Sequence, residues 1–202
     1  MSVRFQYNKT SLHQLNKQLQ IRLKALPTLK NKESALRVEV KRSKNKFAEL
    51  ENKLEKLISG EDENMRMWNE FDPGLVREEK VILSYKMIAG IKTPELDTLT
   101  FHVKDFFIFG SPKWYLDGIQ VLKTLITLVI EKEIVKKKVE MLEYARKKTT
   151  QKVNLYEKVQ IPAHKDAILK IKRFLEDEDN LAKASQKIVK NRQQQAEEAA
   201  LV

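Results

Sequence analysis

The chain has 202 residues and a formal net charge of +11, and 33% of its residues are charged. It contains no cysteine, which excludes a disulfide scaffold, thiolate metal sites and a cysteine nucleophile. Five glycines and five prolines are few for a fold with many turns, so the composition favours long helices.

The charge is distributed unevenly along the chain. Residues 1–59 carry 14 basic and 5 acidic side chains (+9), residues 60–112 carry 6 and 10 (−4), and residues 113–202 carry 19 and 13 (+6). The basic ends and the acidic middle are therefore expected to meet different partners. A basic surface can attract nucleic acid or an acidic protein cavity.

No stretch predicts insertion into a membrane. The first ten residues lack the apolar core of a secretory signal. The most apolar stretch, residues 116–130, contains Asp117 and Lys123 and is shorter than the roughly 20 residues that a spanning helix needs. We expect it to be a buried helix.

One heptad register runs unbroken from Leu12 to Leu57 and predicts a long coiled-coil helix. Pro27 lies inside it and removes a helical hydrogen bond, so we expect a kink there or a helix start nearby. Thr10 or Ser11 is expected to cap this helix, and Ser59-Gly60 to end it. Eleven of its fourteen a and d positions are apolar, and the exceptions are Arg22, Glu33 and Ser43. The fourteen positions are Leu12, Leu15, Leu19, Arg22, Leu26, Leu29, Glu33, Leu36, Val40, Ser43, Phe47, Leu50, Leu54 and Leu57.

The middle of the chain predicts a small head that contains a β-hairpin. The β-prone runs Val81–Ile91 and Thr98–Phe109 are separated and flanked by turn signals. The stretch Leu75–Tyr85 could instead form a short helix. An isolated hairpin is marginal in water, so it should pack on the helices or on a partner protein. The turn signals are Gly90, Thr93-Pro94 and Gly110-Ser111-Pro112.

A second, longer helix is predicted from Trp114 onward. Pro162 should bend it or mark a join. We expect a mostly α protein, a long antiparallel two-helix coiled coil with residues 1–59 and 113–202 as its helices and residues 60–112 as its head. The end of the last helix should project alone or pair with the start of the chain. Its seam positions are Val121, Leu125, Leu128, Lys132, Val135, Val139, Leu142, Arg146, Thr149, Val153 and Tyr156, then Ile168, Ile171 and Leu175.

The last third of the chain carries short motifs in a fixed order. In order and spacing they resemble the C-terminal signature of the D subunit of the V-type (vacuolar/archaeal-type) rotary ATPases. The motifs are Lys152-Val153-Asn154-Leu155-Tyr156-Glu157, Ile161-Pro162, Ile168, Ile171, Leu175-Glu176-Asp177-Glu178, Lys187 and Lys190.

The earlier parts of the chain resemble the same family. Residues 29–36 are similar to its Leu-Lys-x-Lys-Arg-Asp-x-Leu motif, with Glu33-Ser34 in place of Arg-Asp. Asn8-Lys9-Thr10 stands where the family has Asn-Pro-Thr, and residues 89–94 resemble a Gly-Val…Pro element. The resemblance therefore spans nearly the whole chain.

The resemblance implies a non-catalytic rotor subunit of the central stalk. Such a coiled coil sits with both termini inside a ring of A and B subunits. Its middle segment lies towards the membrane beside the F subunit and docks on a membrane-proximal subunit. The stalk couples ATP hydrolysis or synthesis to ion transport, as a peripheral cytoplasmic part of the complex on the inner face of the membrane.

Two sets of side chains are candidates for these contacts. Basic residues of the two ends are expected to face the ring, and apolar residues of the head and adjoining helices to contact the F subunit. The ring-facing candidates are Lys9, Lys172, Arg173, Lys183, Lys187, Lys190 and Arg192. The F-subunit candidates are Phe47, Leu50, Leu54, Ile126, Val129, Phe106 and Phe107, within a contact that also includes the 81–109 segment.

No catalytic, cofactor or metal site is expected. The chain lacks a GxxxxGK[ST] phosphate loop, and its three histidines have no ligand-like spacing. Two other functions are compatible with basic coiled coils. One is a prefoldin-like holdase, although the Ile-Pro signature argues against it. The other is a nucleic-acid binder, which the acidic middle argues against and which predicts a steep salt dependence.

Overall fold

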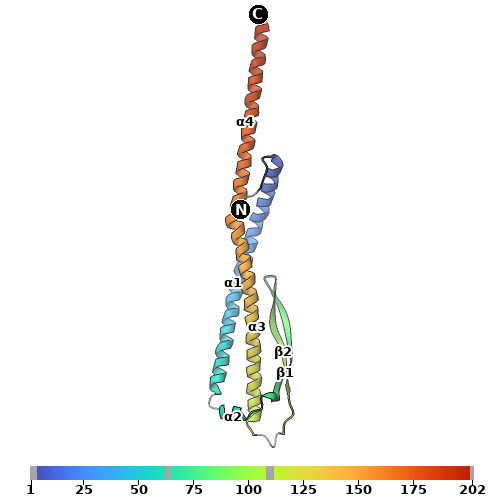
Figure 1. Cartoon of the computed structure of the whole chain (residues 1–202), viewed down its shortest axis with the longest axis vertical. Helices are drawn as coiled ribbons and strands as arrows, with labels where there is room; N and C mark the ends of the chain where they lie inside the picture. Colours follow the sequence, from blue (N-terminus) through green and yellow to red (C-terminus); the bar gives the residue numbers. More distant parts are fainter. Residues whose placement is uncertain (1–3, 62–64, 108–111, 201–202) are drawn as a thin grey trace. The chain divides into compact units, whose positions relative to one another are not determined.

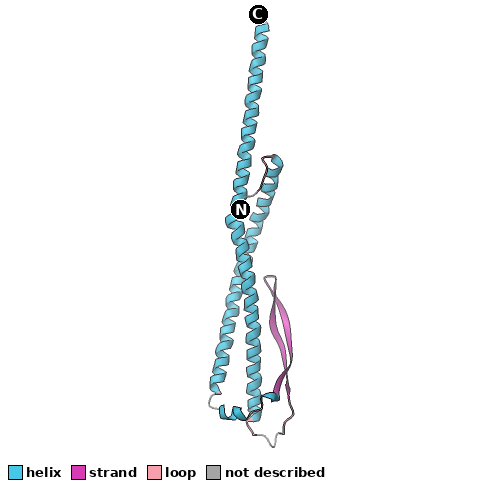
Figure 2. Cartoon of the chain, viewed as in Figure 1, coloured by secondary structure: helices cyan, strands magenta, loops and turns pink. Residues whose placement is uncertain are grey.

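A computed structural model describes residues 4–61, 65–107 and 112–200 of the chain. The described part is mostly helical, with a long helical hairpin and one two-stranded antiparallel sheet in the middle of the sequence (Figure 2). The elements are α1 (Lys9–Gly60), α2 (Met65–Glu70), the 3₁₀ turn η2 (Pro73–Leu75), β1 (Val76–Ile88), β2 (Ile91–Val103), α3 (Tyr115–Asn154), the π-helical segment η4 (Leu155–Gln160) and α4 (Ile161–Ala200), labelled in Figure 1 where space allows.

The chain divides into two compact units. The terminal unit comprises Met1–Asn31 and Thr150–Val202, and the middle unit comprises Lys32–Thr149. The helices α1 and α3 each contribute to both units. The two units are described separately below.

The terminal unit packs the first part of α1 against the first part of α4. Its core contains Leu15 and Leu19 of α1 and Ile161, Ile168 and Ile171 of α4. Polar pairs cross the same interface in antiparallel order, since Gln18 contacts His164, Arg22 contacts Gln160 and Lys30 contacts Glu157. The antiparallel hairpin predicted from the two registers is therefore confirmed here.

Asn8, rather than Thr10 or Ser11, caps α1. Its Oδ1 accepts a hydrogen bond of 2.6 Å from the backbone N–H of Ser11, which satisfies one of the free donors of the first turn. The predicted cap was therefore wrong by two or three residues. The predicted end at Gly60 is confirmed, and α1 continues through Pro27, so a helix start near that residue is also wrong.

A π-helical segment ends at Gln160, two residues before Pro162, and joins α3 to α4. The backbone N–H of Ile161 donates to the carbonyl of Tyr156, five residues earlier, as in a π-helix. Because Pro162 has no N–H to donate, the wider turn falls where the α-helical hydrogen bonding is interrupted anyway. The predicted join at Pro162 is confirmed.

The β-hairpin of the middle unit begins earlier than its sequence suggests, and its pairing register shifts at two places, between Glu78 and Lys80 and between Ile82 and Leu83. Strand β1 starts at Val76, which contradicts a helix over Leu75–Tyr85, and its tip is Ala89-Gly90, with φ of 48° and 77°. Pro94 pairs with Tyr85 inside β2, so the turn predicted at Thr93-Pro94 is wrong. Each strand of a two-stranded sheet is an edge, and an edge strand tolerates a proline. Phe109 and the predicted turn at Gly110-Ser111 lie outside the described residues.

The hairpin packs on the helices of the middle unit at both of its ends. At the tip, Ile88 and Ile91 contact the cluster of Leu36, Val40 and Leu142 on α1 and α3. At the base, Val76 joins an aromatic cluster around Phe71 and Ile119 that also includes Trp68, Phe101, Phe106, Trp114 and Tyr115. The predicted packing of the hairpin on the helices is confirmed.

Candidate interaction surfaces

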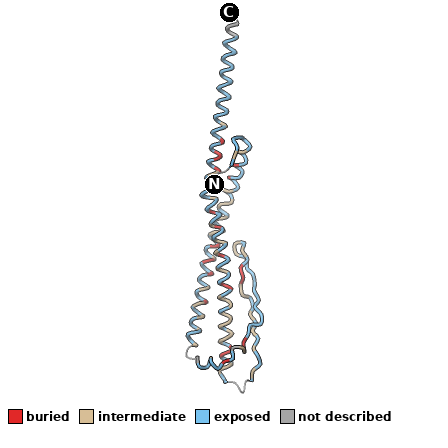
Figure 3. Tube along the Cα trace, in the orientation of Figure 1, coloured by how far each residue is buried: buried red, intermediate tan, exposed pale blue. Residues whose placement is uncertain are grey.

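The outer stretch of α4, residues 176–196, is bare. Every residue in it is exposed, drawn pale blue in Figure 3, whereas Ile168 and Ile171 of the same helix are buried. The start of the chain reaches as far as Phe174, whose ring lies 4.9 Å from that of Tyr7. Of the two predicted alternatives, α4 therefore pairs with the start of the chain up to this point and stands alone beyond it.

The bare stretch has an apolar side and a basic side. Leu181 and Ile188 are seven residues apart and so share one side of the helix, and Leu181 is 70% exposed. The same side continues back to Phe174, just before the bare stretch. At about 100° per residue, most of the predicted ring-facing lysines lie on the opposite side. Arg192 falls on the apolar side and Arg173 between the two. The opposite side carries Lys172, Lys183, Lys187 and Lys190.

All seven predicted ring-facing residues are exposed. Lys9 is the first residue of α1, and the other six lie on α4. None of the seven makes an ion pair with another described residue. Their charges are thus available to a partner or to solvent.

The predicted contacts with the F subunit divide into covered and accessible residues. Leu50 is buried at 4% exposure, and Phe47 is half-buried with the Lys132 ammonium 5.7 Å from its ring centre. Val129 and Phe107, at 46% and 73% exposure, are accessible. The remaining members, Leu54, Ile126 and Phe106, are half-buried.

An exposed apolar row on β1 was missed at the level of individual residues. The prediction covered the 81–109 segment but named only Phe106 and Phe107 within it. Alternate residues of the strand, Val81, Leu83, Tyr85 and Met87, are 39% to 68% exposed. Their period-two spacing in VILSYKMI was the available signal.

Lys138 ties the hairpin to both helices of the middle unit. Its ammonium lies 2.7 Å from Glu95 of β2 and 4.0 Å from Glu39 of α1, and the lysine side chain is only 12% exposed. These groups line a hollow of about 280 Å³ together with Arg42, Lys46, Lys86, Glu131 and Ser43. The Lys138 hydrogen bond is the main cause that lowers the pKa of Glu95 below its ordinary value.

The terminal unit contains a buried polar contact between α1 and α4. His164 is 3% exposed, and its Nδ1 donates to the carbonyl of Gln160 at 2.7 Å. Its Nε2 lies 3.2 Å from the side-chain oxygen of Gln18. Because both ring nitrogens are engaged by protein groups, His164 is part of the packed interface.

The described residues contain no group of three or more His, Cys, Asp or Glu side chains placed to hold a metal ion. Within the same part of the chain, no helix combines the length and apolar character needed to cross a bilayer.

Comparison with known proteins shows a match over nearly the whole chain. The family model for the ATP synthase D subunit matches residues 11–191. The V-type ATP synthase D subunit of Borreliella burgdorferi is 29% identical over 185 residues, which cover 91% of this chain and 92% of the relative. Those of Chlamydia pneumoniae and Chlamydia felis are 27% identical over 183 residues (88% and 87% coverage) and 26% identical over 178 residues (86% of each chain).

The match includes the heptad seams of both long helices, the hairpin between them and the motifs around η4. With the fold predicted from its sequence and a family match across its length, this chain belongs to the ATP synthase D-subunit family.

Proposed function

We propose that this chain is the central-stalk rotor shaft of a V-type rotary ATPase. In this role it has no catalytic site of its own. It couples ATP hydrolysis or synthesis in a ring of A and B subunits to ion translocation through the membrane ring. Its place is the cytoplasmic side of the membrane, as a peripheral part of the complex.

The bare stretch of α4 is the observation that carries this proposal. An amphipathic helix that docks on a flat surface needs contacts on one side only. Here both sides stand uncovered, with Leu181 and Ile188 on one and Lys183, Lys187 and Lys190 on the other. A cavity that surrounds the helix can meet both sides at once, as the centre of a ring does.

The basic side suits a shaft that must turn. Exposed ion pairs contribute at most about 1 kcal/mol each, so many such contacts hold the helix without fixing it at one angle. We propose Lys9, Lys172, Arg173, Lys183, Lys187, Lys190 and Arg192 as these ring contacts.

Cross-linking from single cysteines tests this proposal directly. The chain has no cysteine, so each introduced thiol reports on one position only. We expect Ile188→Cys to cross-link to the A or B subunits in complexes purified from source cells. Lys80→Cys on exposed β1 is the matched control and should not reach the ring.

Other products of the same experiment would contradict the rotor. Recovery of a mixed set of unfolded proteins supports a holdase instead. Recovery of DNA or RNA that is released by salt supports a nucleic-acid binder. Absence of the A and B subunits from the purified material removes the basis of the proposal.

We propose that the F subunit contacts the exposed row on β1 together with Val129 and Phe107. Apolar residues that are exposed singly are normal on a protein surface, whereas four on one strand form a continuous patch of the kind that marks an interaction site. Tyr85→Glu should reduce the amount of the F subunit that purifies with the chain, whereas Lys80→Gln on the same strand should not. Equal recovery with both variants contradicts this contact.

We propose that the third partner, a membrane-proximal docking subunit, receives the acidic middle of the chain. Residues 60–112 carry a net charge of −4 between two basic ends. Charge complementarity would then direct the two parts of the chain to different partners.

A further inference from the structure

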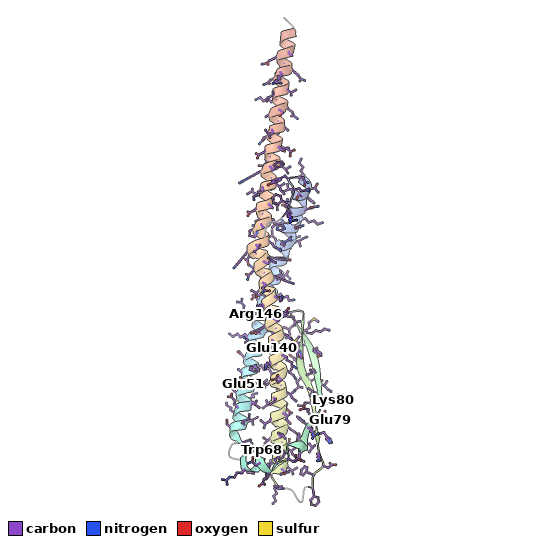
Figure 4. The ribbon with its side chains drawn as sticks, in the orientation of Figure 1. Glu51, Trp68, Glu79, Lys80, Glu140 and Arg146 are labelled. Atoms are coloured by element: carbon purple, nitrogen blue, oxygen red, sulfur yellow. The ribbon has the colours of Figure 1, made fainter. Side chains whose placement is uncertain are left out.

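A small hollow at the base of the middle unit has no role in the function proposed above. It lies beside α2 and the first turns of α3, and its volume is about 250 Å³. Trp68, which Figure 4 labels near the bottom of the view, lines it together with Trp114. Two carboxylate residues, Glu61 and Asp117, complete its polar part.

The aromatic walls are held in place by their neighbours. The ring centres of Trp68 and Trp114 are 6.0 Å apart, and each lies within 5.7 Å of the ring of Phe71. A Cβ added to Gly118 would lie 3.1 Å from the Trp114 ring, so this glycine lets the indole lie close against α3. Both tryptophans are only half-buried and keep ring surface open.

The two carboxylates differ in their hydrogen-bond and ion-pair partners. Glu61 accepts a hydrogen bond of 3.1 Å from the indole N–H of Trp68, which fixes it at the wall. No described residue forms a hydrogen bond or an ion pair with Asp117. An aromatic wall beside a carboxylate that lacks a counter-charge is the chemistry that recognises an organic cation.

Charge and size restrict the ligand further. The described residues of the adjoining stretch before β1 carry more acidic than basic side chains, with Glu61, Glu70 and Asp72 against Arg66. The hollow is below the roughly 300 to 1,000 Å³ of sites for drug-sized ligands, so it fits the head group of one side chain. A guanidinium matches better than an ammonium, because it is planar, stacks on aromatic faces and pairs with a carboxylate through two N–H groups.

We propose that this hollow receives an arginine side chain of a partner protein. The indole of Trp114 provides the stacking surface, and Asp117 provides the counter-charge. The site itself needs only a partner with an exposed arginine. The identification of this partner as the membrane-proximal subunit rests on the function proposed above. If that function is wrong, the proposal that the hollow binds arginine is unaffected.

Indole resonances provide a direct test on the full chain. The chain has two tryptophans and both line the hollow, so ¹H–¹⁵N spectra show two indole signals that report on it alone. We expect N-acetyl-arginine amide to shift both signals saturably. The citrulline analogue, which is neutral and of nearly the same shape, should leave them in place.

Substitutions separate recognition from general charge. Asp117→Asn should weaken binding about threefold to fivefold, as expected for one partly exposed ion pair. Asp166→Asn, at an exposed position of α4, is the matched control and should not change it. Unchanged positions of the indole signals in the free variants show that the fold is intact.

Three results would overturn the proposal. The first is no saturable shift with the arginine compound, and the second is an equal shift with citrulline. The third is a response to phosphatidylcholine vesicles without a response to arginine, which would assign the hollow to a lipid head group.

Discussion

Two stretches of α4 have similar helical sequence and opposite surroundings. In the stretch up to Leu175, α1 and the segment before it pack over Ile161, Ile168 and Ile171. From Glu176 to Ala196 every residue is exposed, although Leu181 and Ile188 continue an apolar side. Helical propensity does not explain this difference, since both stretches are α-helix. What differs is the packing partner within the chain. On the function proposed above, the bare stretch is where a second molecule packs.

The strongest test of this comparison substitutes the same residue type in each stretch. Ile171 is 0% exposed, so Ile171→Ala should lower the free energy of unfolding by about 2 to 5 kcal/mol through lost burial and a cavity. Ile188 is 55% exposed, and Ile188→Ala should change it by less than about 0.5 kcal/mol. Urea unfolding followed by circular dichroism measures both. Similar losses of unfolding free energy would show that the two stretches are equally packed in the isolated chain.

The covered stretch also contains a polar contact, and its contribution can be separated. His164→Ala removes a side chain that is 3% exposed, together with its contacts with the Gln160 carbonyl and the Gln18 side chain. We expect a loss of about 1 to 3 kcal/mol in the free energy of unfolding. Lys165→Ala, at the exposed neighbouring position, should have little effect. Equal effects would mean that apolar packing alone stabilises the covered stretch.

The sequence predicted the covered seams well, because heptad periodicity reports burial. All fourteen a and d positions from Leu12 to Leu57 are buried or half-buried, including the polar Ser43 and Arg22. The same holds for all eleven positions from Val121 to Tyr156. Periodicity alone could not show where the seam loses its partner. That point depends on how far the start of the chain reaches along α4.

The hairpin and the hollow were less accessible to sequence reasoning. Thr93-Pro94 has the composition of a turn, yet pairing with β1 places it inside a strand. Trp68 and Trp114 are distant in sequence and carry no shared motif, so only the fold brings their rings together. The contact of Lys138 with Glu95 likewise depends on where the hairpin lies along α3.

In the middle unit, an ion pair rather than apolar packing holds one element against another. Lys138→Met removes the ammonium that Glu95 and Glu39 share. We expect a loss of about 1 to 2 kcal/mol at pH 7, between the values for exposed ion pairs and for buried charged hydrogen bonds. Urea unfolding at pH 7 measures it. Lys44→Met removes the more exposed pair with Glu143 and should cost less.

The same variant has a characteristic pH dependence. The Lys138 hydrogen bond lowers the pKa of Glu95 from its ordinary value of 4.5, so it stabilises the fold fully above that pH. This stabilisation is lost as the pH falls through the lowered pKa. The difference between wild type and Lys138→Met should therefore shrink at acidic pH. A difference that is the same at pH 7 and at the acidic end would show that Lys138 acts through packing of its alkyl chain.

The smallest expected effect on stability belongs to the bare stretch, and it is paired with a large effect on assembly. Leu181→Ser alters a side chain that is 70% exposed and touches little of its own chain. The free energy of unfolding of the isolated chain should change by less than about 0.5 kcal/mol. Recovery of the A and B subunits with the tagged chain should fall, since the apolar side of α4 would then lack one of its contacts.

Val38→Ser is the matched control, because Val38 is 67% exposed on α1 in the middle unit. It should leave both stability and recovery of the ring subunits unchanged. Loss of the ring with both variants would mean that any exposed apolar residue supports assembly. Loss with neither would mean that the ring contacts the bare stretch through its lysines. A chain that ends before Lys187 would then test those lysines directly. Loss with Leu181→Ser alone identifies the uncovered apolar side of α4 as the part of the shaft that its partner completes.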